Sequence, residues 1–454
     1  MGKSAIFGFA LILQCGCVLS ARDVASSAEA RSHYTLALNY LQQHQSENAI
    51  RELKEALALN PHFKEARYTL GVALLDGGRS AEAVPILTKS IDESPCDAAI
   101  WANLVRAKFE SGDPKAAILT VRRIVEGMPG NVQLLVTLGA MSYRYQEIQE
   151  ARYLFENAAE LMPDDPDIKL LLAKASLKGG EPVEAAAVLK SVPANSGKAG
   201  EISYTRGLAL ALLGKLEEAH AELSAALDAD SLNPRYLVAR AWVFQLQNRQ
   251  DEAIADLVRA RTADQRAPIV QYRLAVSYFL LKEYPKAVES CEAALRLSPQ
   301  YDAAYLVMGR ARLEEEENDA ARVAFERALV LKPESALYHR ELGVVLFKEG
   351  KLNDCNREIE ASLKLDPKAA QSYLWRARVL VRQGDRQHAI ADLETALALQ
   401  PSLSIAYSEL ATLYQEEGQS QKATSTLARK KEADANSETA GNQHLLGDLH
   451  DLLY

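Results

Sequence analysis

The side chains that most often carry out chemistry are scattered along this sequence of 454 residues. Its eight histidines are His33, His44, His62, His220, His339, His388, His444 and His450. None of them pairs with another at the spacing that places two metal ligands on one helix face. The motifs H-E-x-x-H, G-x-S-x-G and G-x-G-x-x-G and the P-loop motif are all missing. The sequence therefore predicts no catalytic centre, no metal and no cofactor, and we expect a protein that is not an enzyme.

The cysteines do not have the number or spacing of a disulfide framework. Cys15 and Cys17 lie in the N-terminal segment, and only Cys96, Cys291 and Cys355 follow it. The last two fall at apolar positions of the repeat described below, where a thiol packs as a small hydrophobic group. They are also too far apart to form a bridge. The first follows a proline and is expected to be exposed, but no neighbour that would activate its thiol is evident.

The N-terminus has the pattern of a secretory leader. Residues 1–3 supply a short positive stretch, residues 5–13 are apolar, and small residues at Ser20 and Ala21 suit a cleavage site. The apolar run is shorter than the roughly 20 residues that span a membrane. We predict a signal peptide over residues 1–21, with an uncleaved anchor or a bacterial lipoprotein as open alternatives. The protein is then exported, periplasmic or secreted, and touches a membrane only through an uncleaved leader.

The overall charge narrows the class of partner. The formal net charge is −9 and the sequence pI is about 5.6. A protein that coats nucleic acid usually needs a basic footprint, so we expect no nucleic-acid partner. Glycine and proline are few and regularly placed, which is typical of helices separated by short turns.

A period of 34 residues organises the chain. It is marked by the prolines Pro61, Pro95, Pro129, Pro163, Pro299, Pro333, Pro367 and Pro401. At a position ten residues after the mark, eleven of the twelve repeats have glycine or alanine, as at Gly71, Gly139, Gly207, Gly309 and Gly343, and the exception is Val105. Twelve residues further stands an alanine in all repeats but one, which has Cys355. We predict two helices per repeat, which cross closely where these two small positions face each other.

Two more positions of the repeat indicate how each hairpin is built. Four residues after the alanine stands a large apolar residue, such as Leu87, Phe155, Phe325 or Leu427, which we expect to fill the core. The turn between the two helices often carries glycine in a left-handed conformation. These glycines are Gly78, Gly112, Gly180, Gly214, Gly350, Gly384 and Gly418. The acidic run at 314–317 falls at one such turn, and we interpret it as a solvated turn.

These spacings resemble the tetratricopeptide repeat, whose pattern is W-x-x-L-G-x-x-Y, then A-x-x-x-F, then P over 34 residues. The ninth repeat carries the resemblance best, with Tyr305, Met308, Gly309, Ala321, Phe325 and Pro333. The resemblance implies an all-α fold, a right-handed α-solenoid superhelix of about twelve helix-turn-helix repeats, with first helices on the concave face. We expect repeats 1–5 over residues 30–199 and repeats 6–12 over residues 200–437.

Two segments depart from the repeat. Residues 191–200 have a loop composition, which predicts either a longer turn between repeats or a hinge between two sub-arrays. In residues 438–454, leucines recur at helical spacing. We interpret this segment as a capping helix over the last repeat, with a partner-binding amphipathic tail as the alternative.

The resemblance also implies which positions of the first helices face a binding groove. Basic residues outnumber acidic ones at these positions, so an acidic protein would present a mildly basic groove. The candidate peptide-binding residues are Arg106, Arg144, Lys174, Lys178, Arg310, Arg340, Lys348, Arg378, Arg382, Trp242 and Tyr272. The hypothesis is a groove for a peptide of acidic or carboxylate character. The alternative is that the arginines are solvated or pair with acids within the array.

The function that follows is a non-enzymatic scaffold that binds other proteins or peptides. The alternative is a non-catalytic subunit of an envelope enzyme or of an assembly complex. An RNA-binding helical repeat is disfavoured because that family has a period of 35 residues and because the leader predicts export.

Overall fold

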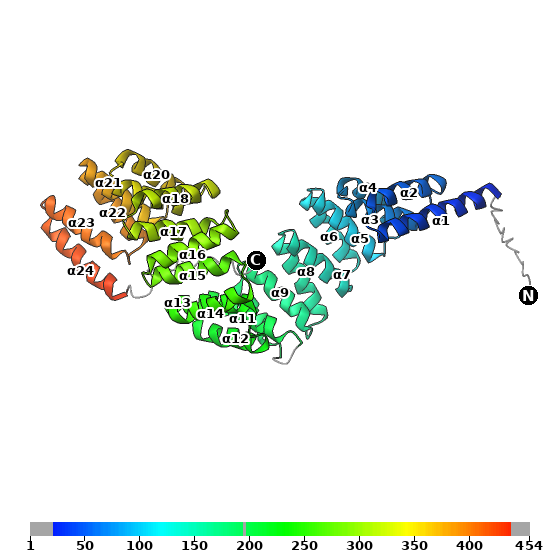
Figure 1. Cartoon of the computed structure of the whole chain (residues 1–454), viewed down its shortest axis with the longest axis horizontal. Coiled ribbons are helices and arrows are strands. Elements are labelled where there is room, and N and C mark those ends of the chain that lie inside the picture. The colour runs from blue at the N-terminus through cyan, green and yellow to red at the C-terminus, as the bar shows by residue number, and fades with distance from the viewer. Residues whose placement is uncertain (1–20, 194–196, 437–454) are drawn as a thin grey trace, which may run out of the picture. The chain divides into compact units, whose positions relative to one another are not determined.

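The computed structural model describes residues 21–193 and 197–436, with side chains over 27–193 and 197–434. The described residues form 24 α-helices and no strand (Figure 1). The predicted leader over 1–21 and the predicted capping helix over 438–454 lie almost wholly outside the described residues. No described helix is long and apolar enough to cross a membrane.

The helices alternate regularly, with first helices odd-numbered and second helices even-numbered. The first twelve are α1 Ala21–Gln42, α2 Ser46–Leu59, α3 Lys64–Asp76, α4 Ser80–Glu93, α5 Ala98–Glu110, α6 Pro114–Gly127, α7 Val132–Arg144, α8 Ile148–Leu161, α9 Pro166–Lys178, α10 Pro182–Lys190, α11 Ala199–Leu212 and α12 Leu216–Ala229. The remaining twelve are α13 Pro234–Leu246, α14 Gln250–Ala263, α15 Pro268–Leu280, α16 Tyr284–Leu297, α17 Asp302–Glu314, α18 Asn318–Leu331, α19 Ala336–Lys348, α20 Leu352–Leu365, α21 Ala370–Gln383, α22 Arg386–Leu399, α23 Ser404–Glu416 and α24 Ser420–Asn436. This order confirms the predicted fold class of twelve helical hairpins.

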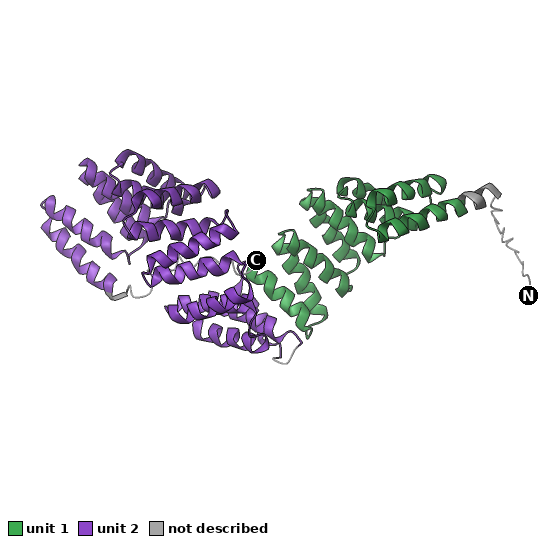
Figure 2. Cartoon of the chain, viewed as in Figure 1, with its two compact units in different colours: residues 1–179 green, residues 180–454 purple. Residues whose placement is uncertain are grey.

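The chain forms two compact units, Met1–Gly179 and Gly180–Tyr454 (Figure 2). Helix α10 ends at Lys190, so it has nine residues where most other second helices have fourteen. Of the loop predicted over 191–200, the described residues before 199 are not helical, whereas Ala199 and Gly200 already belong to α11. The predicted division at 199/200 and the hinge at 191–200 stay predictions.

The turns inside the hairpins show how strictly the repeat is kept. In all twelve hairpins the residue at one fixed position has a positive φ, between 56° and 85°. Seven of these residues are the predicted glycines, and the other five are His44, Gln146, Asn248, Lys282 and Glu316. The conformation is thus required by the short turn and not by the residue type, since non-glycine residues adopt it at a cost.

The glycines of the first helices make room for large side chains. A Cβ atom added at Gly139 would lie 2.6 Å from Phe155, and one at Gly309 would lie 2.6 Å from Phe325. The partner is therefore the large residue four positions after the alanine, and not chiefly the alanine that we expected. The large side chain fills the space that glycine leaves, which brings the helices together through side-chain packing.

The predicted core positions are buried with one exception. The alanines at the second-helix position, together with Cys355, are at most 1% exposed, and Phe155 and Phe325 are 1% and 0% exposed. Leu427, predicted to fill the core, is instead 39% exposed. This side chain lies in α24, and no described helix follows to cover it.

Candidate protein-binding face

The first helices lie on the inner side of the stack within each unit. First helices of successive repeats contact each other in most of the stack, as α15 with α17 and α19 with α21 do. Successive second helices make weaker contacts. Helix axes converge on the inner side of a curved stack, so this pattern agrees with the expected placement of the first helices. We call their surface the first-helix face.

In the N-terminal unit, Arg106 of α5 is held by acids of the array. Its guanidinium forms ion pairs with Asp76, at 3.2 Å, and with Glu110, at 2.8 Å. Arg144, the last residue of α7, is exposed. The side chains that the sequence placed in one basic groove thus differ in how accessible they are.

The two lysines of α9 are half-buried. Lys178 lies over the ring of Tyr143, 4.5 Å from its centroid. Burial lowers the pKa of the Lys178 ammonium. Lys174 occupies the preceding turn of the same helix, so both predicted lysines lie on one side of α9.

Trp242 and Tyr272 are the two predicted aromatic contacts, and the structure places both in the core. Their exposed fractions are 4% and 2%. Tyr272 packs edge-on against Tyr301, with ring centroids 5.0 Å apart. Both rings pack inside the array because burying them removes apolar surface from water. This corrects the expectation that their rings line the surface of the groove.

In the C-terminal unit, Arg310 of α17 and Arg340 of α19 converge on one acid. Arg310 donates to Glu341 Oε1 at 2.6 Å, and Arg340 donates to the same oxygen at 2.9 Å. All three side chains are at most 13% exposed. Burial alone would raise the pKa of the Glu341 carboxyl, but the two guanidiniums outweigh it and lower that pKa to about 2. Arg310 therefore links α17 to α19 through Glu341, and Arg340 pairs with the same acid within α19.

Arg378 of α21 is held in the same way. Its Nε and Nη2 atoms donate to Glu409 Oε1 of α23 at 2.9 and 2.7 Å. Its guanidinium also lies over the ring of Trp375, 4.2 Å from the centroid. A charge that is paired and stacked in this way has few donors left for a ligand.

Arg382, one turn after Arg378 on α21, has a different environment. It is exposed and lies over the ring of Phe347, 5.1 Å from the centroid. Lys348, the last residue of α19, is also exposed. No carboxylate among the described side chains forms an ion pair with Arg382 or Lys348.

A cavity of about 340 Å³ opens beside Arg382. Its walls come from α19, α21, α22 and α23. The lining residues are Phe347, Arg378, Val381, Arg382, Leu393, Glu409, Thr412, Leu413 and Glu416. We call this cavity the Arg382 cleft. Helices α21 and α23, which flank it, contact each other more weakly than α19 and α21 do.

The acids that hold the groove arginines were not found from the sequence, although a signal exists. Glu341 follows Arg310 by 31 residues, and Glu409 follows Arg378 by the same interval. In a 34-residue repeat this interval places the acid on the next first helix, slightly less than one turn before the equivalent position. A search for charges of opposite sign at this interval would have identified both pairs.

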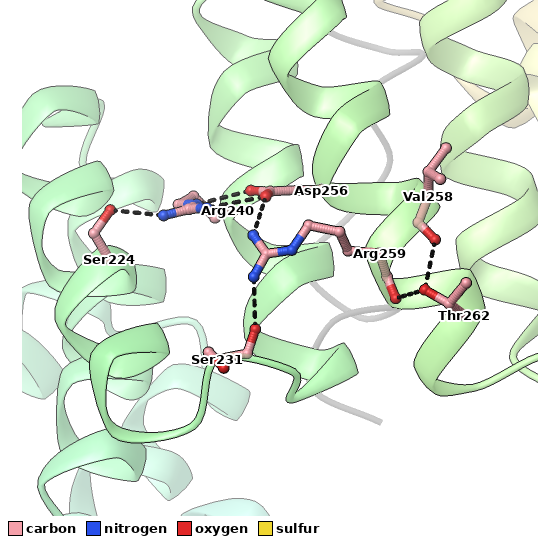
Figure 3. A network of polar contacts seen from close by, with 7 residues as sticks. All are labelled: Ser224, Ser231, Arg240, Asp256, Val258, Arg259 and Thr262. Carbon is pink, nitrogen blue, oxygen red and sulfur yellow. Dashed lines mark hydrogen bonds and ion pairs between the residues drawn. The ribbon is translucent and has the colours of Figure 1, made fainter.

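A second set of ion pairs joins the two helices of one hairpin. Arg240 of α13 binds Asp256 of α14 through two hydrogen bonds, of 2.7 and 2.9 Å, and reaches Ser224 of α12 at 3.1 Å (Figure 3). Arg259 adds a further contact to Asp256, at 3.2 Å. Asp256 is 5% exposed, so its two arginines supply the partners that a buried carboxylate needs. The pairs Arg206–Glu222 and Arg376–Asp392 repeat this arrangement.

The remaining reactive residue types have structural environments. Within the described residues, no group of three or more His, Cys, Asp or Glu side chains could hold a metal ion. Cys291 and Cys355 are buried free thiols, as predicted, and Cys96 is exposed. Burial raises the pKa of the Cys355 thiol to about 12. His33 and His339 each place Nδ1 2.8 Å from a glutamate of the second helix of the same repeat, namely Glu52 or Glu358.

Three models described as tetratricopeptide repeat match most of the chain. One matches residues 34–98, 204–268, 306–354 and 356–404, a second matches 74–138 and 144–204, and a third matches 268–301. The chain is also 30% identical, over 122 residues, to RNA polymerase II-associated protein 3 of Mus musculus. That match covers 25% of this chain, and the chain spans only 18% of the mouse protein.

Three solved structures are similar to the chain at low sequence identity. A tetratricopeptide repeat protein from Parabacteroides merdae is 18% identical, with a TM-score of 0.46 over 55% of this chain and 98% of that chain. Yeast Tom70 is 15% identical, with a TM-score of 0.45 over 91% and 96% of the two chains. The Cut9–Hcn1 structure is 15% identical, with a TM-score of 0.42 over 94% and 97%.

Proposed function

Because the chain belongs to the tetratricopeptide repeat family, we propose that it is an exported, non-enzymatic scaffold that binds an acidic partner protein or peptide on its first-helix face. Protein–protein interaction is the general role of this family, which is as a rule non-catalytic. The observation that carries the finer proposal is the pair of exposed cations, Arg382 and Lys348, in the C-terminal unit. The other predicted groove arginines of that unit, Arg310, Arg340 and Arg378, are paired with acids. An acidic partner would complete the electrostatic pairing of the two exposed cations.

The test is a pull-down from envelope extract with the full chain as bait. The test variant is Arg382→Ala combined with Lys348→Ala, because both side chains are exposed and their loss leaves the fold intact. Arg310, Arg340 and Arg378 are unsuitable, since their removal would leave buried or half-buried acids without a partner. Arg357→Ala serves as the control, because this arginine of α20 is 69% exposed and lies on a second helix.

We expect the wild-type chain and the control to recover the same partner and the double variant to lose most of it. Equal recovery by all three proteins would move the binding surface away from the two cations. Recovery of a partner that has enzymatic activity only in the complex would favour the alternative, a non-catalytic subunit of an envelope enzyme or assembly complex.

Export is proposed from the leader pattern over residues 1–21. N-terminal sequencing of the protein from its native host tests it: a mature chain beginning at about residue 21 or 22 is the expected result. A full-length chain in the membrane fraction would favour the anchor, and a full-length chain in the cytoplasm would contradict export.

A further inference from the structure

The Arg382 cleft combines features that select one kind of ligand, and the reasoning rests on the proposed function of protein binding. Its volume of about 340 Å³ is at the small end for ligand sites, which suits one or two side chains of a peptide better than a cofactor. Part of its wall is apolar and open: Val381 is 41% exposed, beside Phe347 and the largely buried Leu413. An apolar group placed there would cover this surface.

Among the charged residues that line the cleft, one arginine has no acid partner. Glu409 is occupied by Arg378, and Glu416 is occupied by Arg386, whose Nε lies 3.0 Å from Glu416 Oε2. These two acids and their two arginines balance one another. Arg386 does not line the cleft, so the lining charges, two arginines and two glutamates, sum to zero. Arg382 is nevertheless the lining cation without an acid partner among the described side chains, because both lining acids are already paired.

The contact between Arg382 and Phe347 determines which N–H donors of the guanidinium a ligand can reach. A guanidinium that lies over an aromatic ring uses its flat face, and its N–H donors stay in the plane. The guanidinium of Arg382 lies 5.1 Å from the centroid of the Phe347 ring, and its N–H groups form no ion pair with a described acid and can donate to a ligand. A carboxylate matches the edge of a guanidinium. The paired acids in the wall make the site less suitable for a doubly charged phosphate.

We propose that the Arg382 cleft binds a peptide segment in which an acidic residue stands next to a large apolar residue. The carboxylate pairs with the edge of Arg382, and the apolar side chain rests on Val381 between Phe347 and Leu413. The ion pair Arg310–Glu341 links α17 to α19, and the ion pair Arg378–Glu409 links α21 to α23, so these arginines serve the walls of the cleft.

The test is a selection of random displayed dodecapeptides on the full chain, followed by affinity measurement of the enriched peptides by fluorescence anisotropy. We expect enrichment of Asp or Glu beside Leu, Phe or Met. The variant Arg382→Gln should weaken binding at least about ten-fold, the loss expected for a charge-assisted hydrogen-bonded pair. Val381→Asp, at an exposed position that tolerates polar groups, should weaken it by a similar factor. Arg357→Gln, which removes the same charge from α20, should leave affinity unchanged.

Three results would overturn the proposal: no enriched peptide, enriched peptides without an acidic residue, or equal affinity of the wild-type chain and Arg382→Gln. The pull-down separates this failure from failure of the proposed function. If the wild-type chain and Arg382→Gln recover the same partner, the scaffold function stands, but the Arg382 cleft is not the site that binds the partner. If the wild-type chain recovers no partner, the scaffold function itself fails.

Discussion

Glu341 gives the sharpest test of how the first-helix face is held together. The change Glu341→Gln keeps the size of the side chain and removes its charge, so it imitates the protonated carboxyl. The pKa of Glu341 falls from an ordinary 4.5 to about 2 in the fold, because Arg310 and Arg340 outweigh the effect of burial. At about 1.4 kcal/mol for each pKa unit, this difference corresponds to about 3 kcal/mol of stabilisation at neutral pH. We expect the variant to lose about that amount.

The pH dependence follows from the sign of the change. The folded-state pKa lies below the unfolded value, so the stabilisation is complete well above pH 4.5 and is lost as the pH falls toward 2. The difference between wild type and Glu341→Gln should therefore shrink by about half or more between pH 7 and pH 3. Other acids titrate in both proteins and cancel in this comparison.

Hydrogen exchange is the suitable assay, since a long repeat array does not unfold in one cooperative step. Opening free energies would be measured for peptides from α17 and α19, with exchange rates corrected for the intrinsic effect of pH. Glu360→Gln, an exposed position on α20, is the control and should change them by less than about 0.5 kcal/mol. A loss below about 1 kcal/mol in Glu341→Gln, or a difference that stays constant from pH 7 to pH 3, would refute the reasoning.

Three further changes test the packing of the repeats, each by hydrogen exchange or thermal unfolding. Asp256→Ala leaves two arginines without their carboxylate and should cost about 3 kcal/mol locally, whereas Glu82→Ala, which removes a 54%-exposed side chain from its pair with Arg79, should cost far less. Equal losses would contradict the role of burial. Lys282→Gly relieves a φ of 62° and should stabilise its hairpin by about 0.5–1 kcal/mol, while a net loss would show that the turn carries no strain. Gly309→Ala brings a Cβ against Phe325 and should cost about 1–3 kcal/mol; an unchanged Tm would mean that the ring moves aside freely.

The fold was largely predictable because the same sequence pattern recurs in every repeat. A left-handed turn at Glu316, for example, does not follow from that residue alone, since glutamate rarely adopts a positive φ. It follows from the register, because glycine stands at the same position in seven other hairpins. Averaging over repeats removes the ambiguity of each single segment.

The candidate site was less predictable because accessibility depends on neighbours outside the repeat pattern. Arg310 and Arg382 both occupy positions that face the first-helix side, yet only Arg382 is exposed and lacks an acid partner among the described side chains. The difference comes from Glu341 on the next first helix, which pairs with Arg310, whereas no described acid pairs with Arg382. Similarly, Trp242 is of a residue type that often contacts ligands, but it is buried. A large apolar ring is stabilised more by packing between helices than by facing solvent.

The pattern of contacts within each unit also has a mechanical consequence. Closely contacting helices belong to the same repeat or to adjacent repeats, and the arginine–acid links described above join helices of the same or of adjacent repeats. A pulling force along such a stack passes through the interfaces in series, so their compliances add. Each unit can then lengthen by small rotations at many interfaces while its helices stay intact, and tension first ruptures the weakest interface.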